Sequence, residues 1–256
     1  MNGPARRVVS LVPSSTESVV ALRGAAALVG CTRYCTEPAG SLAAVARLGG
    51  TKNPQREAIL ALAPDLVLGN AEENRAEDLD WLGARVPVLV QTPTTVAGAR
   101  AALVELAAAL GVDDAAQPFV DRLDAELQRQ AASPALPVFY AIWRKPWMSV
   151  NHSTYIHDVL RLAGASNVTA GRAARYPRLD DDELAELGAA AVLLPDEPWV
   201  FDAAQRDELA ARRGFGVARL VLCDGKDFCW HGVRAAAGLA AARRLVAGLA
   251  ADAMAR

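Results

Sequence analysis

Short runs of apolar and β-branched residues alternate with Ala- and Leu-rich stretches along the whole chain. The runs have the length of strands, and the stretches between them carry apolar residues at helical spacing. This alternation is typical of parallel sheets that helices cover on both faces. The predicted strands are residues 8–12, 27–31, 66–68 and 86–90 in the first half, and 138–142, 167–169, 191–194 and 219–223 in the second. The pattern therefore predicts an α/β fold.

The two halves of the chain share a related segment. Residues 49–68 and 171–194 each begin with Gly, pass through a Pro and a short acidic helix, and end in an apolar strand. Glu57 then corresponds to Asp182, Leu62 to Leu187 and Val67 to Val192. We therefore expect two similar, Rossmann-like lobes with parallel sheets.

A single long helix is expected between the lobes, in residues 113–133. Its apolar residues recur at helical spacing, and two aspartates precede them in a favourable place for the helix dipole. Pro118 suits a first turn, so the helix is expected to start near Ala115 or Pro118 and to end at the Ser-Pro step of residues 133 and 134. The predicted domains are an N-terminal lobe of residues 1–112, this bridging helix, and a C-terminal lobe of residues 134–256.

Composition narrows the class of partner. The 256 residues include 27 basic and 29 acidic side chains without a long run of either sign. This pattern predicts no basic surface of the kind that binds the phosphate backbone of nucleic acid. Charged residues interrupt every apolar stretch before the roughly 20 residues that a membrane span needs, so we expect no spanning segment. The first predicted strand begins close to Met1, so the sequence as written predicts a cytoplasmic protein, or a periplasmic one if a leader precedes it.

The stretch from residue 7 to residue 34 predicts a ligand-binding edge. A strand enters a Pro-Ser turn, a helix follows, and a second strand leads to Tyr34. Open α/β sheets bind ligands where their strands end, because helix N-termini direct free N–H groups into the crevice there. We therefore expect Ser14 and Tyr34 to contact a ligand.

Aromatic residues of the second half gather after predicted strands rather than within them. Such rings can form a platform for a large flat ligand at little cost in conformational entropy. The alternative is that they only cap the cores of the lobes. The ring-bearing residues are Trp143, Trp147, Tyr176, Trp199, Phe201, Phe228 and Trp230.

No catalytic motif appears. Ser14 and Cys35 lie outside a nucleophile elbow, and no phosphate-binding glycine loop is present, so we predict that the chain is not an enzyme. No metal site of its own is expected, although His231 or Cys35 could serve as an axial ligand to a bound metal chelate. The cysteines form two close pairs, 31 with 35 and 223 with 229, at spacings that structural zinc does not use, and buried unpaired thiols are the expected state.

The chain resembles the class III, helical-backbone substrate-binding proteins of ABC importers, and among them the cobalamin-binding branch. The resemblance rests on RVVSLVPSSTE, VGCTRYCTEP, GGTKNPQREAILALAPDLVL, WMSVNHSTYIHDVLRLAGASNV, YPRLDDDELAEL and WHGVRAAAGL, which together cover nearly the full length. The chain departs from the branch at Gly50, where a cobalamin-binding relative carries Trp.

The resemblance implies two lobes bridged by a rigid helix, with a cobalamin-like corrinoid or related metal chelate held in the cleft between them. It implies no cofactor of the protein's own, a monomer, and an ABC permease as a partner that docks on Glu73 and Asp182. The expected ligand-binding residues are Ser14, Tyr34, Lys52, Trp143, Arg144, Trp147, Tyr176, Trp199, Phe228, Trp230 and His231.

Two alternatives stay open from the residues. The first is a haem or ferric-siderophore binding protein, in which Arg144, Lys52 and Arg75 face carboxylates or catecholates. The second, from another class, is a cytosolic corrinoid or metal enzyme that uses Cys35 and His231.

Overall fold

The computed structural model describes residues 3–131, 134–211 and 219–254. The chain divides into two compact units. Unit 1 consists of Met1–Pro93, Ala97–Asp124 and His231–Ala235, and unit 2 consists of Thr94–Val96, Ala125–Trp230 and Ala236–Arg256. The predicted α/β class with parallel sheets is confirmed, because each unit is built on one parallel sheet.

The sheet of unit 1 has five strands in the order β3-β2-β1-β6-β7. They are β1 (Val8–Ser10), β2 (Leu28–Cys31), β3 (Ala46–Arg47), β6 (Leu66–Gly69) and β7 (Val88–Val90), and all their pairings are parallel. The strand order reverses direction at β1, since β2 lies on one side of it and β6 on the other. This reversal between β1 and β6 is the place at which open α/β sheets form a binding crevice.

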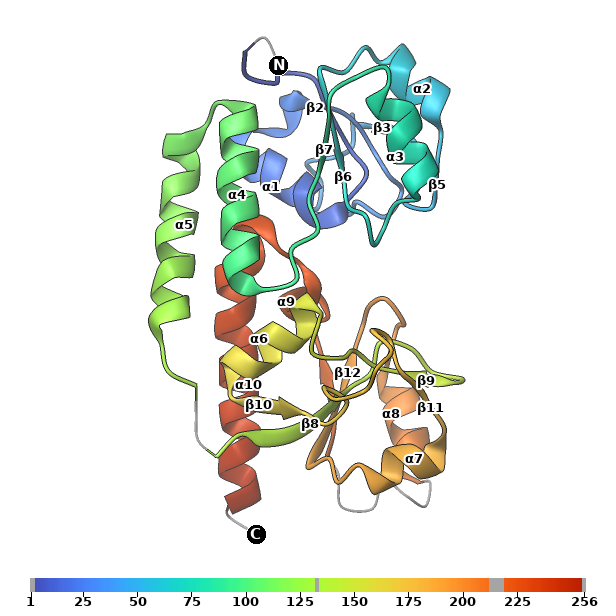
Figure 1. The fold of residues 1–256 in the computed structure, drawn as a ribbon, viewed down its shortest axis with the longest axis vertical. Coiled ribbons are helices and arrows are strands. Elements are labelled where there is room, and N and C mark those ends of the chain that lie inside the picture. Colours follow the sequence, from blue (N-terminus) through green and yellow to red (C-terminus); the bar gives the residue numbers. More distant parts are fainter. Residues whose placement is uncertain (1–2, 132–133, 212–218, 255–256) are drawn as a thin grey trace. The chain divides into compact units, whose positions relative to one another are not determined.

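Helices cover both faces of this sheet (Figure 1). Val8, Leu66 and Leu68 face α1 (Pro13–Arg23) and α4 (Val96–Leu110), whereas Val9 and Val67 face α2 (Arg56–Ala61) and α3 (Ala76–Gly83). Alternate residues of a strand point to opposite faces, so an apolar strand fills both cores at once. A short hairpin of β4 (Gly49–Gly50) and β5 (Asn53–Pro54) precedes α2, and the 3-10 turn η1 (Ala25–Ala27) leads into β2.

The sheet of unit 2 has four parallel strands in the order β10-β8-β12-β13. They are β8 (Leu136–Tyr140), β10 (Ala165–Asn167), β12 (Ala191–Pro195) and β13 (Arg219–Cys223). Here the order reverses between β8 and β12. A small antiparallel pair of β9 (Trp147–Met148) and β11 (Arg178–Leu179) lies between β8 and β12 in the sequence.

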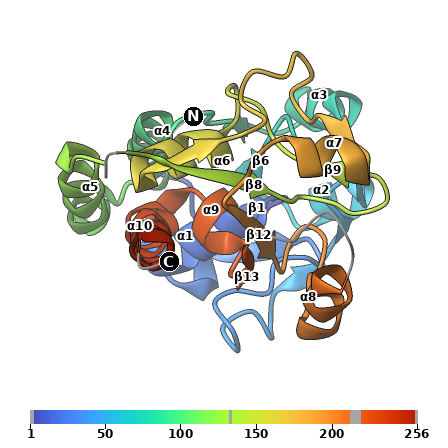
Figure 2. The ribbon, with the colours of Figure 1, turned by 90° about the horizontal axis from the view of Figure 1, so that it is seen from below.

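The helices of unit 2 lie on both sides of its sheet (Figure 2). Leu184 of α7 (Asp181–Glu186) and Leu209 of α8 (Ala203–Ala210) pack with Val192 and Leu194 of β12. The opposite face is covered by α6 (Tyr155–Ala163), α9 (Lys226–Cys229) and α10 (Ala235–Met254). The six-residue helices α2 and α7 occupy the same place in the two related segments, each directly before an apolar strand, so the internal similarity read from the sequence corresponds to similar structure.

The expected long helix of residues 113–133 corresponds to α5 (Asp113–Gln128). It begins at Asp113 rather than near Ala115 or Pro118, so Pro118 lies inside it and both aspartates lie in its first turn. Residues 132 and 133, where the helix was expected to end, lie outside the described residues. The boundary between the two units falls within α5, after Asp124. The longest described helix is α10, with 20 residues, and not α5. No described helix is both long enough and apolar enough to cross a membrane.

Most strand predictions hold to within two residues, and residues 219–223 match β13 without error. The strand predicted at residues 167–169 overlaps β10 at one residue, because β10 starts at Ala165 and ends at Asn167. The side chain of Asn167 accepts a hydrogen bond from the backbone N–H of Thr169 at 3.1 Å, which turns the chain away from the sheet.

Candidate functional site

The carboxyl ends of the strands meet at one edge of each sheet, because all strands of a sheet run parallel. In unit 1 this edge carries the start of α1 after β1, the Tyr34 turn after β2, and the Asn70 turn after β6. In unit 2 it carries the Trp143 loop after β8 and the Trp199 loop after β12. These loops hold most of the side chains that the sequence proposes as ligand contacts.

Ser14 and His231 contact each other in unit 1. Oγ of Ser14 lies 3.5 Å from Nε2 of His231, and the two side chains are 3% and 7% exposed. Burial lowers the pKa of His231 to about 4, so its imidazole is neutral at neutral pH. A neutral ring nitrogen can accept or donate a hydrogen bond, but both groups are covered by protein and already have a partner.

The segment that follows His231 is fastened to α1. The guanidinium of Arg234 forms two hydrogen bonds with the carboxylate of Glu17, at 2.6 and 2.9 Å, and the N–H of Val233 donates to Oγ of Ser18 at 3.2 Å. Gly232 has a φ of +81°, and a Cβ there would lie 2.1 Å from Oγ of Ser18. Only glycine fits this close approach, so the position of His231 is set by the α1 helix.

Tyr34 lies in an exposed turn after β2. Its side chain is 52% exposed, the Arg33 guanidinium lies 5.0 Å from its ring centroid, and the same guanidinium donates to its hydroxyl at 3.1 Å. A Cβ at Gly50 would lie 3.3 Å from Cε2 of Tyr34, so the position that departs from the cobalamin-binding branch adjoins this ring. Lys52, two positions after Gly50, is exposed, and its Nζ donates to the carbonyl of Glu72 at 2.6 Å.

The turn that carries Glu73 is held by two asparagines. Oδ1 of Asn70 accepts from the N–H groups of Glu72 and Glu73, and Nδ2 of Asn74 donates to the carbonyl of Thr51 at 2.9 Å. Glu73 is half-buried in this turn. Arg75, which follows it, is exposed and lies 3.5 Å from the carboxylate of Glu77.

Two indoles of unit 2 form a pair at the strand ends. Trp143 is 39% exposed, and its ring centroid lies 4.6 Å from that of Trp199 in an edge-to-face arrangement. The indole N–H of Trp199 donates to Gln205 at 3.1 Å, which fixes the ring that supports Trp143. Tyr176 is 38% exposed, and its ring lies 5.8 Å from the guanidinium of Arg175.

Three other aromatic residues proposed as ligand contacts are buried. Trp147 is 2% exposed and stacks on Phe201 at a centroid distance of 6.1 Å, and Phe228 is 1% exposed and packs on Tyr140 at 5.1 Å. Trp230 is 6% exposed, with Nζ of Lys226 5.6 Å from its ring. The alternative that the rings cap the cores therefore accounts for the contacts of Trp147 and Phe228.

Arg144 also turns inward. Its side chain is 5% exposed and forms two hydrogen bonds, of 2.7 and 3.1 Å, with the carboxylate of Glu208. No sequence pattern indicates this partner, since the two residues are 64 positions apart. These two bonds engage both terminal nitrogens, whereas the buried Nε of Arg144 has no hydrogen-bond partner among the described residues.

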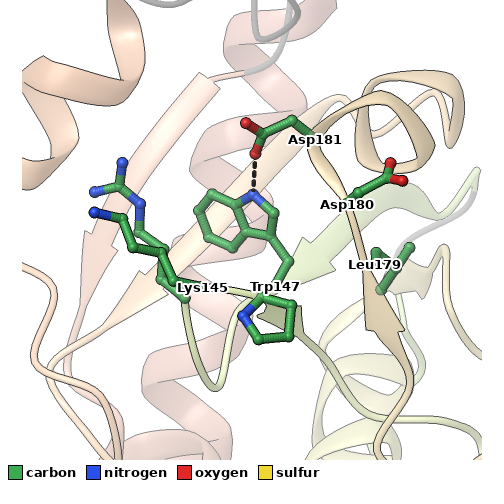
Figure 3. A pocket seen from close by; sticks show the side chains of 7 residues that line it. Lys145, Trp147, Leu179, Asp180 and Asp181 are labelled. Carbon is green, nitrogen blue, oxygen red and sulfur yellow. Dashed lines mark hydrogen bonds between the residues drawn. The ribbon is translucent and has the colours of Figure 1, made fainter.

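A pocket of about 260 Å³ lies beside Trp147 (Figure 3). Lys145 lies on one side of the indole, and Asp180 and Asp181 lie on the other. The indole N–H donates to Oδ1 of Asp181 at 2.7 Å. Pockets for drug-sized ligands have roughly 300–1,000 Å³, so this one is too small for a tetrapyrrole. Its lining residues are Arg144, Lys145, Pro146, Trp147, Leu179, Asp180 and Asp181.

The geometry therefore separates the proposed residues into two groups. Tyr34, Trp143 and Tyr176 present substantial ring area, with Trp199 behind Trp143, whereas Ser14, Arg144, Trp147, Phe228 and His231 are covered by their own neighbours. Arg33, which the sequence analysis did not propose, is placed beside the Tyr34 ring. Arg33 directly precedes Tyr34 in the sequence, and this adjacency is the feature from which its role could have been predicted. Within the described residues, no three His, Cys, Asp or Glu side chains lie together as a metal site requires.

Comparison with known proteins gives consistent results. Residues 8–215 match the family model described as periplasmic binding protein. A vitamin B12-binding protein of Vibrio parahaemolyticus is 29% identical over 192 residues, which cover 72% of this chain and 68% of the relative. These matches are to binding proteins, not to enzymes.

Solved structures share the fold over nearly the whole chain. The periplasmic heme-binding protein BhuT, solved with two hemes, is 26% identical with a TM-score of 0.80, and the alignment covers 96% of this chain and 99% of BhuT. The vitamin B12 binding protein BtuF of Vibrio cholerae is 19% identical with a TM-score of 0.77, and covers 96% of this chain and 98% of its own. With a family model that spans residues 8–215, this chain belongs to the periplasmic binding protein family.

Proposed function

We propose that this protein binds a cobalamin-like corrinoid reversibly and delivers it unchanged to an ABC permease outside the cytoplasm. Its family consists of substrate-binding proteins, and relatives at 27% and 29% identity are named vitamin B12-binding proteins. The ligand of those relatives is the reason for choosing a corrinoid within the wider class of metal chelates.

The observation that carries the proposal is the exposure of three aromatic rings. Tyr34, Trp143 and Tyr176 keep 52%, 39% and 38% of their surface exposed, although burial of such large rings would stabilise the fold. An exposed ring loses little conformational freedom on binding, because only two side-chain torsions must be fixed. Rings of this kind suit a flat ligand that offers a wide apolar face.

The buried residues take a supporting part in this proposal. Trp199 holds Trp143 by an edge-to-face contact, and Trp199 itself packs against the buried cluster that contains Trp147. Ser14 and His231 fix one another at the start of α1. Lys52 and Lys145 are exposed cations that can face phosphate or amide groups at the rim of a corrinoid.

Haem is the second candidate ligand. BhuT, a heme-binding protein, is 26% identical over 96% of this chain, and this identity is close to that of the vitamin B12-binding relatives. The Arg33 guanidinium beside the Tyr34 ring can face a propionate, and tyrosine oxygen is a known axial ligand of haem iron.

Visible spectroscopy separates these candidates. Purified protein is titrated with cyanocobalamin, haemin and a ferric siderophore, and the bound ligand is recovered and identified afterwards. The proposal predicts saturable spectral change with the corrinoid at one equivalent, and recovery of the corrinoid without chemical change. A shifted Soret band with haemin and no response to cobalamin would transfer the assignment to haem, and conversion of the corrinoid would indicate an enzyme.

The permease contact completes the proposal. Asp182 is exposed in the first turn of α7, and Glu73 is half-buried in the turn after β6. A carboxylate on a helix start or a fixed turn is a defined target for an arginine of a partner. The double variant Glu73→Gln/Asp182→Asn should bind ligand normally and fail to stimulate ATP hydrolysis by its permease in liposomes, whereas unchanged stimulation would remove these residues from the interface.

A further inference from the structure

Cys31 and Cys35 come together beneath the Tyr34 turn. Cys31 is the last residue of β2, and a turn closed by the Cys35 N–H and the Thr32 carbonyl, at 3.2 Å, brings the chain back beside it. Nη1 of Arg47 lies 3.2 Å from Sγ of Cys31 and donates to the carbonyl of Cys35 at 2.6 Å, and both cysteines are completely buried. The two cysteines, four positions apart, thus lie in the same buried cluster of unit 1.

Polar groups surround this pair. The hydroxyl of Thr16 donates to Sγ of Cys35 at 3.0 Å, and Oγ1 of Thr32 lies 3.3 Å from the same sulfur. Nη1 of Arg47 donates to Sγ of Cys31 at 3.2 Å and to the carbonyls of Thr32 and Cys35. Both cysteines also belong to the apolar core of unit 1, but these polar contacts distinguish them from an inert cysteine that has apolar neighbours alone.

The surroundings shift the pKa values of the two thiols in opposite directions. The hydrogen bond from Cys31, aided by those from Thr16 and Thr32, lowers the pKa of Cys35 to about 6 against the opposing effect of burial. The hydrogen bond to Cys35 and burial raise the pKa of Cys31 above its usual range. Cys35 is therefore the stronger candidate for the thiolate, which is the reactive form in thiol exchange.

We propose that Cys31 and Cys35 are a redox-active pair that a small-molecule disulfide converts into an intramolecular disulfide. The Cys35 thiolate attacks one sulfur of glutathione disulfide, and one glutathione thiolate leaves as the mixed disulfide forms. Cys31 loses its proton and attacks Sγ of Cys35, and the second glutathione thiolate leaves. Two electrons pass from the cysteines to the oxidant, so one glutathione disulfide yields one protein disulfide and two glutathione molecules.

The buried position sets the rate of this exchange. The oxidant reaches the sulfurs only when the turn of residues 32–35 opens, so oxidation is slower than for an exposed thiol. Once formed, the disulfide closes a loop that contains Tyr34, the most exposed aromatic ring of the described residues. Oxidation therefore restrains the turn that presents this ring.

The other cysteine pair provides an internal control. Cys229 donates to Oε1 of Glu197 at 3.0 Å, and burial together with Asp196, Asp224 and Asp227 raises the pKa of Cys223. A thiol beside carboxylates is a poor source of thiolate. This pair should stay reduced under conditions that oxidise Cys31 and Cys35.

Tryptic digestion can identify the Cys31–Cys35 disulfide directly, because a cleavage site lies between the two cysteines. Trypsin cleaves after Arg33, so residues 24–33 and 34–47 are separate peptides that stay joined only through a Cys31–Cys35 disulfide. Cleavage after Lys226 separates Cys223 from Cys229 in the same way. The folded full-length protein is equilibrated for a day in glutathione buffers of increasing oxidised fraction, quenched with acid, alkylated in denaturant, digested and examined by mass spectrometry.

The proposal predicts that joined peptides 24–33 and 34–47 become the main form of these sequences as the buffer becomes oxidising, and that dithiothreitol reverses the change. The double variant Cys223→Ser/Cys229→Ser should behave in the same way. Alkylation of both Cys31 and Cys35 in every buffer would overturn the proposal, as would a joined peptide that links either of them to Cys223 or Cys229.

Discussion

The indole nitrogen of Trp147 donates a 2.7 Å hydrogen bond to Oδ1 of Asp181, and its ring stacks on Phe201. The first contact ties the loop after β8 to the start of α7, and the second places the ring in the core of unit 2. Trp147 is therefore a residue of the unit's core, although its position after a strand resembles that of a ligand-binding ring.

Trp147→Phe should lower the free energy of unfolding by about 1–3 kcal/mol, because it removes a hydrogen bond and leaves a cavity. Ligand affinity should stay within a factor of about two, since the ring offers no exposed face. Urea unfolding and ligand titration on the same preparation measure both quantities. A large loss of affinity with unchanged stability would assign Trp147 to the binding surface.

Trp143→Ala should show the opposite pattern. The exposed ring contributes one edge-to-face contact, so its loss should cost about 1 kcal/mol of stability. Affinity for the corrinoid should fall about tenfold or more, which corresponds to about 1.4 kcal/mol. Val104→Ala is the matched control, because Val104 is 41% exposed on α4, away from the strand-end loops. Equal effects of the two substitutions on affinity would contradict the assignment of Trp143.

The architecture was largely predictable from the sequence, because parallel sheets covered on both faces produce apolar runs that are easy to recognise. The run of residues 191–194 gave β12 to within one residue. The error at β10 has a local cause: Gly164 ends α6 in the left-handed conformation and the strand starts directly after it, whereas Asn167 begins a side-chain-capped turn. The short strands β9 and β11 were missed, since two residues carry no periodic pattern.

The candidate site was less predictable, because the partners of its residues are distant in the sequence. His231 lies 217 positions from Ser14, and Arg144 lies 64 positions from Glu208. The sequence identified residues that follow strands, but packing decides which of them are exposed. Trp143 and Trp147 illustrate this, since they lie four positions apart and only Trp143 keeps an exposed ring.

The pair of Arg144 and Glu208 should contribute to stability. Arg144 is buried, whereas the Glu208 side chain is 56% exposed, so Glu208→Gln leaves a buried guanidinium with a weaker partner. Because solvent screens the exposed carboxylate, we expect a loss of about 1–2 kcal/mol in urea unfolding at low salt. Glu186→Gln is the control, since Glu186 is an exposed residue of α7. Identical unfolding curves for the two variants would show that the pair contributes nothing.

Stability should depend on pH through His231. Burial lowers its pKa from 6.5 to about 4, so between these values the unfolded chain binds a proton that the folded chain does not. The free energy of unfolding should therefore fall as the pH drops from about 6.5, with about 3 kcal/mol of this contribution lost by pH 4.

His231→Gln removes this dependence. The difference in unfolding free energy between wild type and His231→Gln should shrink as the pH falls from 7 to 4, while His152→Gln, which changes an exposed histidine, should run parallel to wild type. Urea unfolding at half-unit pH steps measures the difference. A difference that is constant with pH would contradict the burial of a neutral imidazole at position 231.

The most direct test of the central claim is a calorimetric titration of the purified wild-type protein with cyanocobalamin. Recognition by exposed aromatic rings predicts one binding site per chain, with a dissociation constant of about 1 µM or tighter and a negative heat-capacity change from the burial of apolar surface. The absence of saturable heat at protein concentrations of about 100 µM, at two temperatures, would contradict the assignment of a corrinoid as the ligand.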